Sequence, residues 1–307
     1  MQYRTDLAME RIDDAEPLEG VHVENEEVLG FTRHLVEIKS EAAAQALQKP
    51  TGCYITFHTA YPRQLDQAAR LDLAQAIADS LSPMLPDDGD ILVVGLGNRR
   101  ITSDALGSRV TEGVLVTRHL KNVLPDSLRH RLRGVCSLAP GVLGVTGMET
   151  AEMVRAAALH VHPSAIIAID ALAARECARI GTTIQLSNTG IQPGSGVGNH
   201  RTGLTQETLH VPVIAIGVPL VVYTGVIIRD ALSALLDDIP KDTQHDKAAE
   251  QLAQKITDEA FAEMVVTPRE IDELVGGLAQ IIALAVNIAL QPRLNRQEIT
   301  MLTNEIL

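Results

Sequence analysis

Apolar runs alternate with amphipathic segments along the middle of the chain. Each run is typical of a strand buried on both faces of a sheet, and a turn and residues at helical spacing follow it. The predicted strands cover residues 91–94, 134–138, 165–170, 182–186 and 211–216. The predicted helices cover residues 110–120, 148–160, 171–180, 220–236, 246–264 and 268–290. This alternation predicts an α/β fold with a mostly parallel sheet and helices on both faces.

The first ninety residues follow a different pattern. Residues 1–30 are polar and acidic, which favours an exposed arm or edge element. Alternating stretches at 31–38 and 53–57 predict two strands, and helical spacing predicts a helix over 65–81. We therefore expect an N-terminal extension, a core over residues 90–290 and helices at the C-terminal end.

Composition narrows the classes of function. Aromatic residues make up only 2% of the chain and the formal net charge is -13, which argues against binding to nucleic acid. The 3 cysteines form no CxxC or Cys/His spacing, so we expect no metal centre and a reducing cytoplasm. The sequence has neither a signal-peptide core nor an uninterrupted apolar run of membrane-spanning length, which predicts a soluble protein without a membrane partner.

Two glycine motifs bear on cofactor binding. Gly95-Leu96-Gly97 follows a strand as in a dinucleotide fingerprint, but Arg100 stands at the third glycine position and no cofactor is expected. The loop at 188–201 lacks the GK[ST] ending of a phosphate loop, although its amides could face an anion.

Two aspartates provide the candidate chemistry. Asp104 follows the strand at 91–94, and Asp170 ends the strand at 165–170. Carboxyl ends of parallel strands converge on one edge, where α/β proteins bind ligands. Two close carboxylates have separated pKa values, so one can act as base and the other as acid on a water molecule that attacks a peptide carbonyl. The alternative is that both aspartates only cap helices.

Backbone amides of two glycine-rich loops could stabilise the resulting oxyanion. The candidate residues of these loops are Gly141, Gly144, Gly147, Gly194, Ser195, Gly196 and Gly198.

Eight blocks of sequence carry a resemblance to a known family. They are VVGLGN (93–98), TSDALG (102–107), LVTRHL (115–120), APGVLGVTGMET (139–150), AIDALAAR (168–175), NTGIQPGSGVGN (188–199), VPVIAIGVP (211–219) and MVVTPREID (264–272). Over residues 91–290 the chain resembles the germination protease of spore-forming bacteria, an endopeptidase that degrades small acid-soluble spore proteins.

The resemblance implies a fold shared with hydrogenase-maturation proteases, a homotetramer in the spore core and a self-processing zymogen without a cofactor. The family's two proposed catalytic aspartates correspond to Asp104 and Asp170. Its self-cleavage site, an acid followed by an apolar-Ala-x-Glu segment, corresponds to Asp6 and the segment from Leu7 to Glu10. Cleavage between Asp6 and Leu7 would separate a pro-segment, 1–6, from a single protease domain, 7–307.

The chain also departs from the family. Asn188 and Gln192 stand where the family commonly has Asp and His, Ser103 replaces a proline, and the stretch 237–261 is short. Two alternatives to the aspartate-dependent protease remain. One is a metal-assisted maturation-type protease with Asp104 as a ligand, and the other is a non-catalytic binding protein on the same fold.

Overall fold

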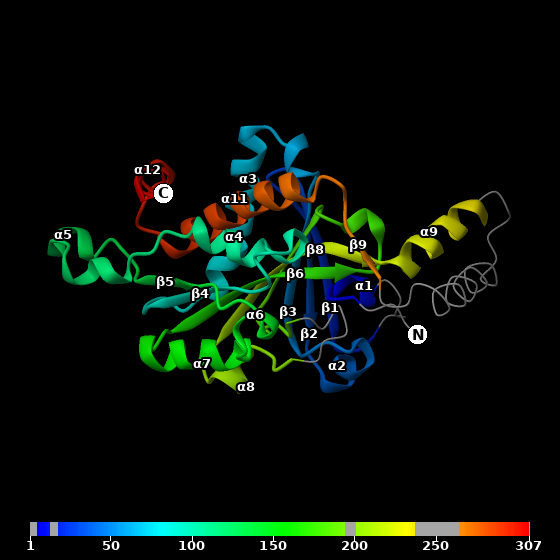
Figure 1. Cartoon of the computed structure of the whole chain (residues 1–307), viewed down its shortest axis with the longest axis horizontal. Coiled ribbons are helices and arrows are strands. Elements are labelled where there is room, and N and C mark those ends of the chain that lie inside the picture. The colour runs from blue at the N-terminus through cyan, green and yellow to red at the C-terminus, as the bar shows by residue number, and fades with distance from the viewer. Residues whose placement is uncertain (1–4, 13–17, 194–200, 237–263, 307) are drawn as a thin grey trace.

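The computed structural model describes residues 5–12, 18–193, 201–236 and 264–306. A nine-stranded sheet runs through this part of the chain, in the order β1-β2-β3-β7-β8-β6-β4-β5 with β9 beside β8 (Figure 1). The strands are β1 Val21–Val28, β2 Phe31–Ile38, β3 Gly52–His58, β4 Ile91–Gly95, β5 Val135–Leu138, β6 Ala165–Ala174, β7 Thr183–Ser187, β8 Val213–Tyr223 and β9 Val265–Val266.

Helices lie on both faces of the sheet, which confirms the expected α/β architecture. They are α1 Met9–Ile12, α2 Glu41–Leu47, α3 Gln67–Leu81, α4 Leu106–Glu112, α5 Asp126–Arg129, α6 Leu143–Thr146, α7 Thr150–Val161, α8 Gln206–Leu209, α9 Thr224–Leu236, α11 Ile271–Leu290 and α12 Arg296–Ile306. Side chains cap several of them: Ser40 accepts from the Ala43 amide at the start of α2, and Asp66 accepts from the Ala69 amide at the start of α3.

Parallel pairing is confined to β5, β4, β6 and β8, and the other described pairings are antiparallel. The sheet is therefore mixed, whereas the strand–helix alternation predicts a mostly parallel one. Leu29 and Gly30 join β1 to β2 with positive φ angles of 51° and 84°. A two-residue turn of this kind makes a hairpin, which fixes antiparallel pairing.

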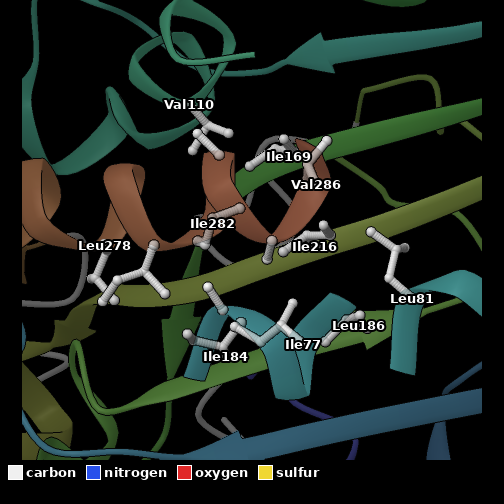
Figure 2. Packing of buried hydrophobic residues seen from close by; sticks show 14 of the residues in the cluster. Ile77, Leu81, Val110, Ile169, Ile184, Leu186, Ile216, Leu278, Ile282 and Val286 are labelled. Carbon is white, nitrogen blue, oxygen red and sulfur yellow. The ribbon is translucent and has the colours of Figure 1, made fainter. Parts of the chain in front are cut away.

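Strand β4 shows why the core has two layers. Ile91 and Val93 pack on the face covered by α3 and α11, while Leu92 and Val94 pack on the face covered by α7. Alternate side chains of a strand point to opposite faces, so a wholly apolar run requires helices on both sides. Figure 2 shows the first of these layers, in which Ile77 and Ile282 face sheet residues such as Ile216.

Helix α11 is long and apolar enough to cross a membrane by length and composition, and it is the one described helix of that kind. It is mostly buried and packs against α3 and α4. These contacts make it a core helix of the α/β layer.

The helix predicted over 171–180 is wrong, because β6 continues to Ala174 and only Cys177–Arg179 forms a 3₁₀ turn. The helix predicted over 220–236 begins at Thr224, since β8 continues to Tyr223. These two strands pair as far as Ala174 and Val222, and this tertiary pairing overrides the helix propensity of the alanines.

Other predicted elements differ in extent. The helix expected over 110–120 is α4, which lies earlier and ends before Gly113. The helices expected over 65–81, 148–160 and 268–290 are confirmed as α3, α7 and α11. Most of the helix expected over 246–264 lies outside the described residues.

The N-terminal residues are not the exposed arm that their polarity favours. Leu7, Ala8 and Glu10 are all almost fully buried. Leu7 packs with Leu172 and Val222, while Ala8 packs with residues of β2, β3 and α2. Strand β1 does form an exposed sheet edge, as expected.

Candidate active site

A glycine turn after β4 positions Asp104. Gly97 has a φ of +96°, and a Cβ atom there would overlap the carbonyl oxygen of Asp104. The close approach lets the Asn98 amide donate to Oδ2 of Asp104 at 2.8 Å. Burial raises the pKa of Asp104, and this hydrogen bond offsets part of the increase.

A second glycine brings Asp104 close to β6. Gly107, in the first turn of α4, lies so close to β6 that a Cβ atom would overlap the carbonyl oxygen of Ile169. The Leu96 amide also donates to that oxygen, at 2.8 Å. Ile169 directly precedes Asp170, so these contacts fix the Asp104 loop against the strand that carries Asp170.

Asp170 lies within β6, not at its end as the sequence predicts, because the strand continues for four more residues. The neighbouring strand β4 ends at Gly95, opposite Ile169. Asp170 therefore still lies just beyond the carboxyl end of β4, at the edge where parallel strands end. The side chain is 5% exposed and accepts from the Ala171 amide at 2.9 Å. Burial raises the pKa of Asp170 well above its usual range, and the negative charge of Asp104 raises it further.

A cavity of about 330 Å³ brings the two aspartates together with the N-terminal segment. Asp6, Asp104 and Asp170 all line it. Residues of the two glycine-rich loops, Val142, Gln192, Pro193 and Arg201, also line it, as does Thr150 just after the first loop.

The structure places only some of the loop residues that are predicted to stabilise an oxyanion. Gly141, Gly144 and Gly147 do not line the cavity. Gly194, Ser195, Gly196 and Gly198 lie outside the described residues.

The Asp6–Leu7 peptide bond lies beside β6 in a network of hydrogen bonds. The Asp6 amide donates to the Ala173 carbonyl at 3.1 Å, and the Asp6 carboxylate accepts from the Ala173 amide at 2.9 Å. The Asp6 carbonyl accepts from Lys49 Nζ at 2.7 Å and from Gln185 Nε2 at 3.2 Å. Gln185 Oε1 accepts from the Ala8 amide at 2.7 Å. The bond is therefore held from both sides.

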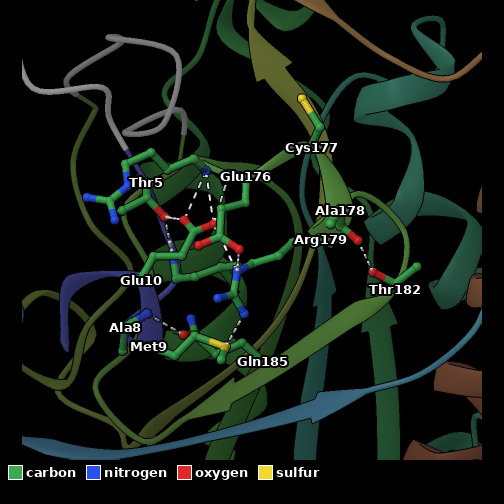
Figure 3. Close-up of polar contacts among 12 residues, drawn as sticks. Thr5, Ala8, Met9, Glu10, Glu176, Cys177, Ala178, Arg179, Thr182 and Gln185 are labelled. Atoms are coloured by element: carbon green, nitrogen blue, oxygen red, sulfur yellow. Dashed lines mark hydrogen bonds and ion pairs between the residues drawn. The ribbon is translucent and has the colours of Figure 1, made fainter. Parts of the chain in front are cut away.

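Glu10, four residues after Asp6, is fully buried and surrounded by polar contacts (Figure 3). Its carboxylate accepts from the amides of Arg175 and Glu176, at 2.9 and 3.1 Å, and from the Thr5 hydroxyl. Arg179 Nε lies 3.3 Å from Glu10 Oε1. Burial nevertheless raises the pKa of Glu10, because desolvation outweighs these favourable contacts.

Sequence reasoning missed Lys49, Gln185 and Arg179. None of them lies in a recognisable motif, and Gln185 is 177 residues from its partner Ala8. Neither spacing nor composition marks such residues, since distant pairings bring them to the site.

The described residues contain no group of three or more His, Cys, Asp or Glu side chains placed to hold a metal ion. Asp6, Asp104 and Asp170 are thus not arranged as a ready-made ligand set.

Comparison with known proteins identifies relatives over nearly the whole chain. The family model for germination protease matches residues 3–263. The germination protease of Clostridium tetani is 37% identical over 323 residues, which cover 99% of this chain and 100% of the relative. That of Caldanaerobacter subterraneus subsp. tengcongensis is 41% identical and covers 97% of both chains. That of Priestia megaterium is 34% identical and covers 96% of this chain and 95% of the relative.

A comparison of structures finds the [NiFe] hydrogenase maturation protease HycI from Thermococcus kodakarensis, at 18% identity and a TM-score of 0.28. This match covers 58% of the chain and 97% of HycI. The full-length sequence matches are decisive. The chain belongs to the germination protease family of peptidases.

Proposed function

We propose that this peptidase is an endopeptidase that degrades small acid-soluble spore proteins during germination, and that it is made as a zymogen that cleaves its own Asp6–Leu7 bond. The observation that carries the proposal is that Asp6 lines the same cavity as Asp104 and Asp170. The Asp6–Leu7 peptide bond is therefore a candidate substrate that is already bound beside the two carboxyl groups.

The unequal environments of the two aspartates support separate roles. Asp170 is almost fully buried and its pKa is raised well above the usual range, which favours its protonated form. Burial also raises the pKa of the half-buried Asp104, but its carboxylate accepts from the Asn98 amide, and the ionised form is favoured more than in Asp170. In the proposed mechanism Asp104 takes a proton from water and Asp170 donates one to the leaving amine.

Local contacts support recognition of an acidic segment by an acidic protein. With a net charge of -13, long-range attraction does not favour such a substrate. Arg179 and two backbone amides nevertheless bind Glu10, and Lys49 contacts Asp6. We propose that the same contacts bind a substrate with a glutamate four residues after its acidic cleavage residue. From the resemblance, we also propose that the protein acts as a homotetramer in the cytoplasm of the spore core.

The test compares the purified chain with its Asp104→Asn and Asp170→Asn variants, each checked for folding by circular dichroism. Mass spectrometry would follow cleavage after Asp6 and of an added small acid-soluble spore protein, with and without a chelator. The proposal expects cleavage by the parent and at least a 1000-fold loss in both variants, on the order found when one catalytic group is removed. Folded variants that still cleave would leave the aspartates only structural. Loss of cleavage with the chelator alone would favour the metal-assisted alternative.

A further inference from the structure

We propose that Lys49 and Gln185 bind the carbonyl oxygen of the peptide bond that is cleaved and stabilise the oxyanion formed there. This inference rests on the proposed self-cleavage after Asp6. It gives catalytic roles to two side chains outside the aspartate pair and outside both glycine-rich loops.

The first observation is that two donors converge on one oxygen. Lys49 Nζ and Gln185 Nε2 lie 2.7 and 3.2 Å from the Asp6 carbonyl oxygen. Groups that stabilise an oxyanion are donors aimed at the oxygen on which charge develops. An ammonium group adds a full positive charge to this arrangement, and charge-assisted hydrogen bonds are about twice as strong as neutral ones.

The orientation of the Gln185 amide follows from its other contact. Oε1 accepts from the Ala8 amide, so Nε2 is the end of the side chain that faces the Asp6 carbonyl. Gln185 is buried on β7, which pairs with β3 and β8 on its two sides. A side chain on a central strand is held rigidly, as a preorganised oxyanion donor must be.

Lys49 is positioned by the end of α2. Gln48 adopts the left-handed conformation with a φ of 53°, and the Lys49 amide donates to the Ala44 carbonyl at 3.1 Å. Burial lowers the pKa of Lys49, while the negative charge of Asp6 offsets part of that decrease. The ammonium group is therefore partly desolvated before reaction, which strengthens its attraction to a developing negative charge.

The two sets of groups lie in adjoining cavities with Asp6 between them. Asp6 lines the cavity of Asp104 and Asp170, and it also lines a neighbouring cavity of about 200 Å³ with Lys49 and Gln185. Water can thus approach the carbonyl carbon from the aspartate side while the carbonyl oxygen stays on its donors.

Hydrolysis of the Asp6–Leu7 bond would proceed in two steps on these residues. The water oxygen bonds to the Asp6 carbonyl carbon as Asp104 takes its proton, and the carbonyl electron pair moves to the oxygen held by Lys49 and Gln185. When the carbonyl re-forms, the bond to the Leu7 nitrogen breaks and that nitrogen takes a proton from Asp170. Lys49 and Gln185 keep their protons throughout.

The test uses the full chain with Lys49→Met and Gln185→Met, which remove the donors and keep similar side-chain lengths. Lys39→Met and Gln45→Met are matched controls, because both parent side chains are exposed. Mass spectrometry would measure the rate of cleavage after Asp6. Loss of one oxyanion donor typically costs about 10²–10³ in rate, so we expect a fall of that order in each variant and none in the controls.

Hydrogen exchange separates catalysis from docking. In the Asp104→Asn background, which keeps the chain uncut, adding Lys49→Met should leave the Asp6 and Leu7 amides as protected as before. If Lys49→Met both slows cleavage in the parent and removes amide protection in the Asp104→Asn background, Lys49 only docks the segment. That result would overturn its catalytic role. Cleavage at the parental rate in both methionine variants would overturn the oxyanion role of Lys49 and Gln185 and leave the proposed self-processing intact. A parent chain that does not cut after Asp6 would overturn the proposed self-processing as well.

Discussion

Gly107 and Ile169 are in direct backbone contact, so that any side chain at position 107 would overlap the Ile169 carbonyl oxygen. Gly107→Ala should therefore force α4 away from β6. Overpacking of this kind costs about 1–3 kcal/mol in stability, and it should also separate the elements that carry Asp104 and Asp170. Urea unfolding and the rate of self-cleavage would measure the two effects.

Gly276→Ala is the control for that change. Gly276 also lies within a helix, but the nearest atom to an added Cβ would be Arg109 Nη1 at 3.9 Å. Its stability should stay unchanged or rise by about 0.5–1 kcal/mol, since alanine is the better helix former. Equal destabilisation by both substitutions would contradict the contact.

Asp170 should make the stability of the fold depend on pH. The pKa of Asp170 is raised in the folded state, so its contribution is fully present below the unfolded pKa of about 4 and is lost as pH rises through the folded pKa. The free energy of unfolding of the parent, relative to Asp170→Asn, should therefore decrease between pH 4 and pH 8. Urea titrations at several pH values would measure it, with Asp126→Asn, an exposed aspartate, as the control. If the difference in free energy of unfolding between the parent and Asp170→Asn does not change with pH, the pKa of Asp170 is not raised in the folded state.

His58 should make the stability of the fold depend on pH in the opposite direction, with stability lost as the pH falls. Burial and, to a smaller extent, the charge of His34, whose ring centroid is 4.8 Å away, lower the pKa of His58 to about 4. Its contribution is present above the unfolded pKa of about 6.5 and is lost as pH falls toward the folded value. Relative to His58→Gln, the parent should lose stability between pH 6.5 and pH 4. The exposed His160→Gln variant should show no such change, and a parallel response of the two variants would refute the assignment.

Glu10 should control docking of the segment that contains the cleavage site. Glu10→Gln can replace Oε1, which accepts from the backbone amides of Arg175 and Glu176, with an NH₂ group that cannot accept. Hydrogen bonds to charged groups contribute about 1.5–3 kcal/mol, so self-cleavage should slow by about tenfold or more. Glu24→Gln, on the exposed strand β1, should cleave at the parental rate. Equal rates for the two variants would mean that the contacts of Glu10 do not position the segment.

The sequence predicts those residues of the site that lie in recognisable short motifs. An apolar strand followed by GLGN identifies β4 and its turn, and acids after apolar runs mark Asp104 and Asp170, although β6 in fact continues beyond Asp170. The donors Lys49, Gln185 and Arg179 could not be predicted this way, because antiparallel pairing of β3 with β7 and burial of the N-terminal segment bring them to the site. The alanine-rich end of β6 was misassigned for the same reason, since pairing with β8 decides its conformation.

The hydrogen bonds between Asp6 and Ala173 join two parts of a single chain. A peptide bond held beside the proposed catalytic groups of the same chain meets them at a constant effective concentration, whatever the amount of protein in solution. If the chain cleaves its own Asp6–Leu7 bond as proposed, that conversion should be first order, with a half-life that does not change on dilution. Removal of the pro-segment would therefore proceed even from a few copies per spore, whereas digestion of other proteins would depend on encounter.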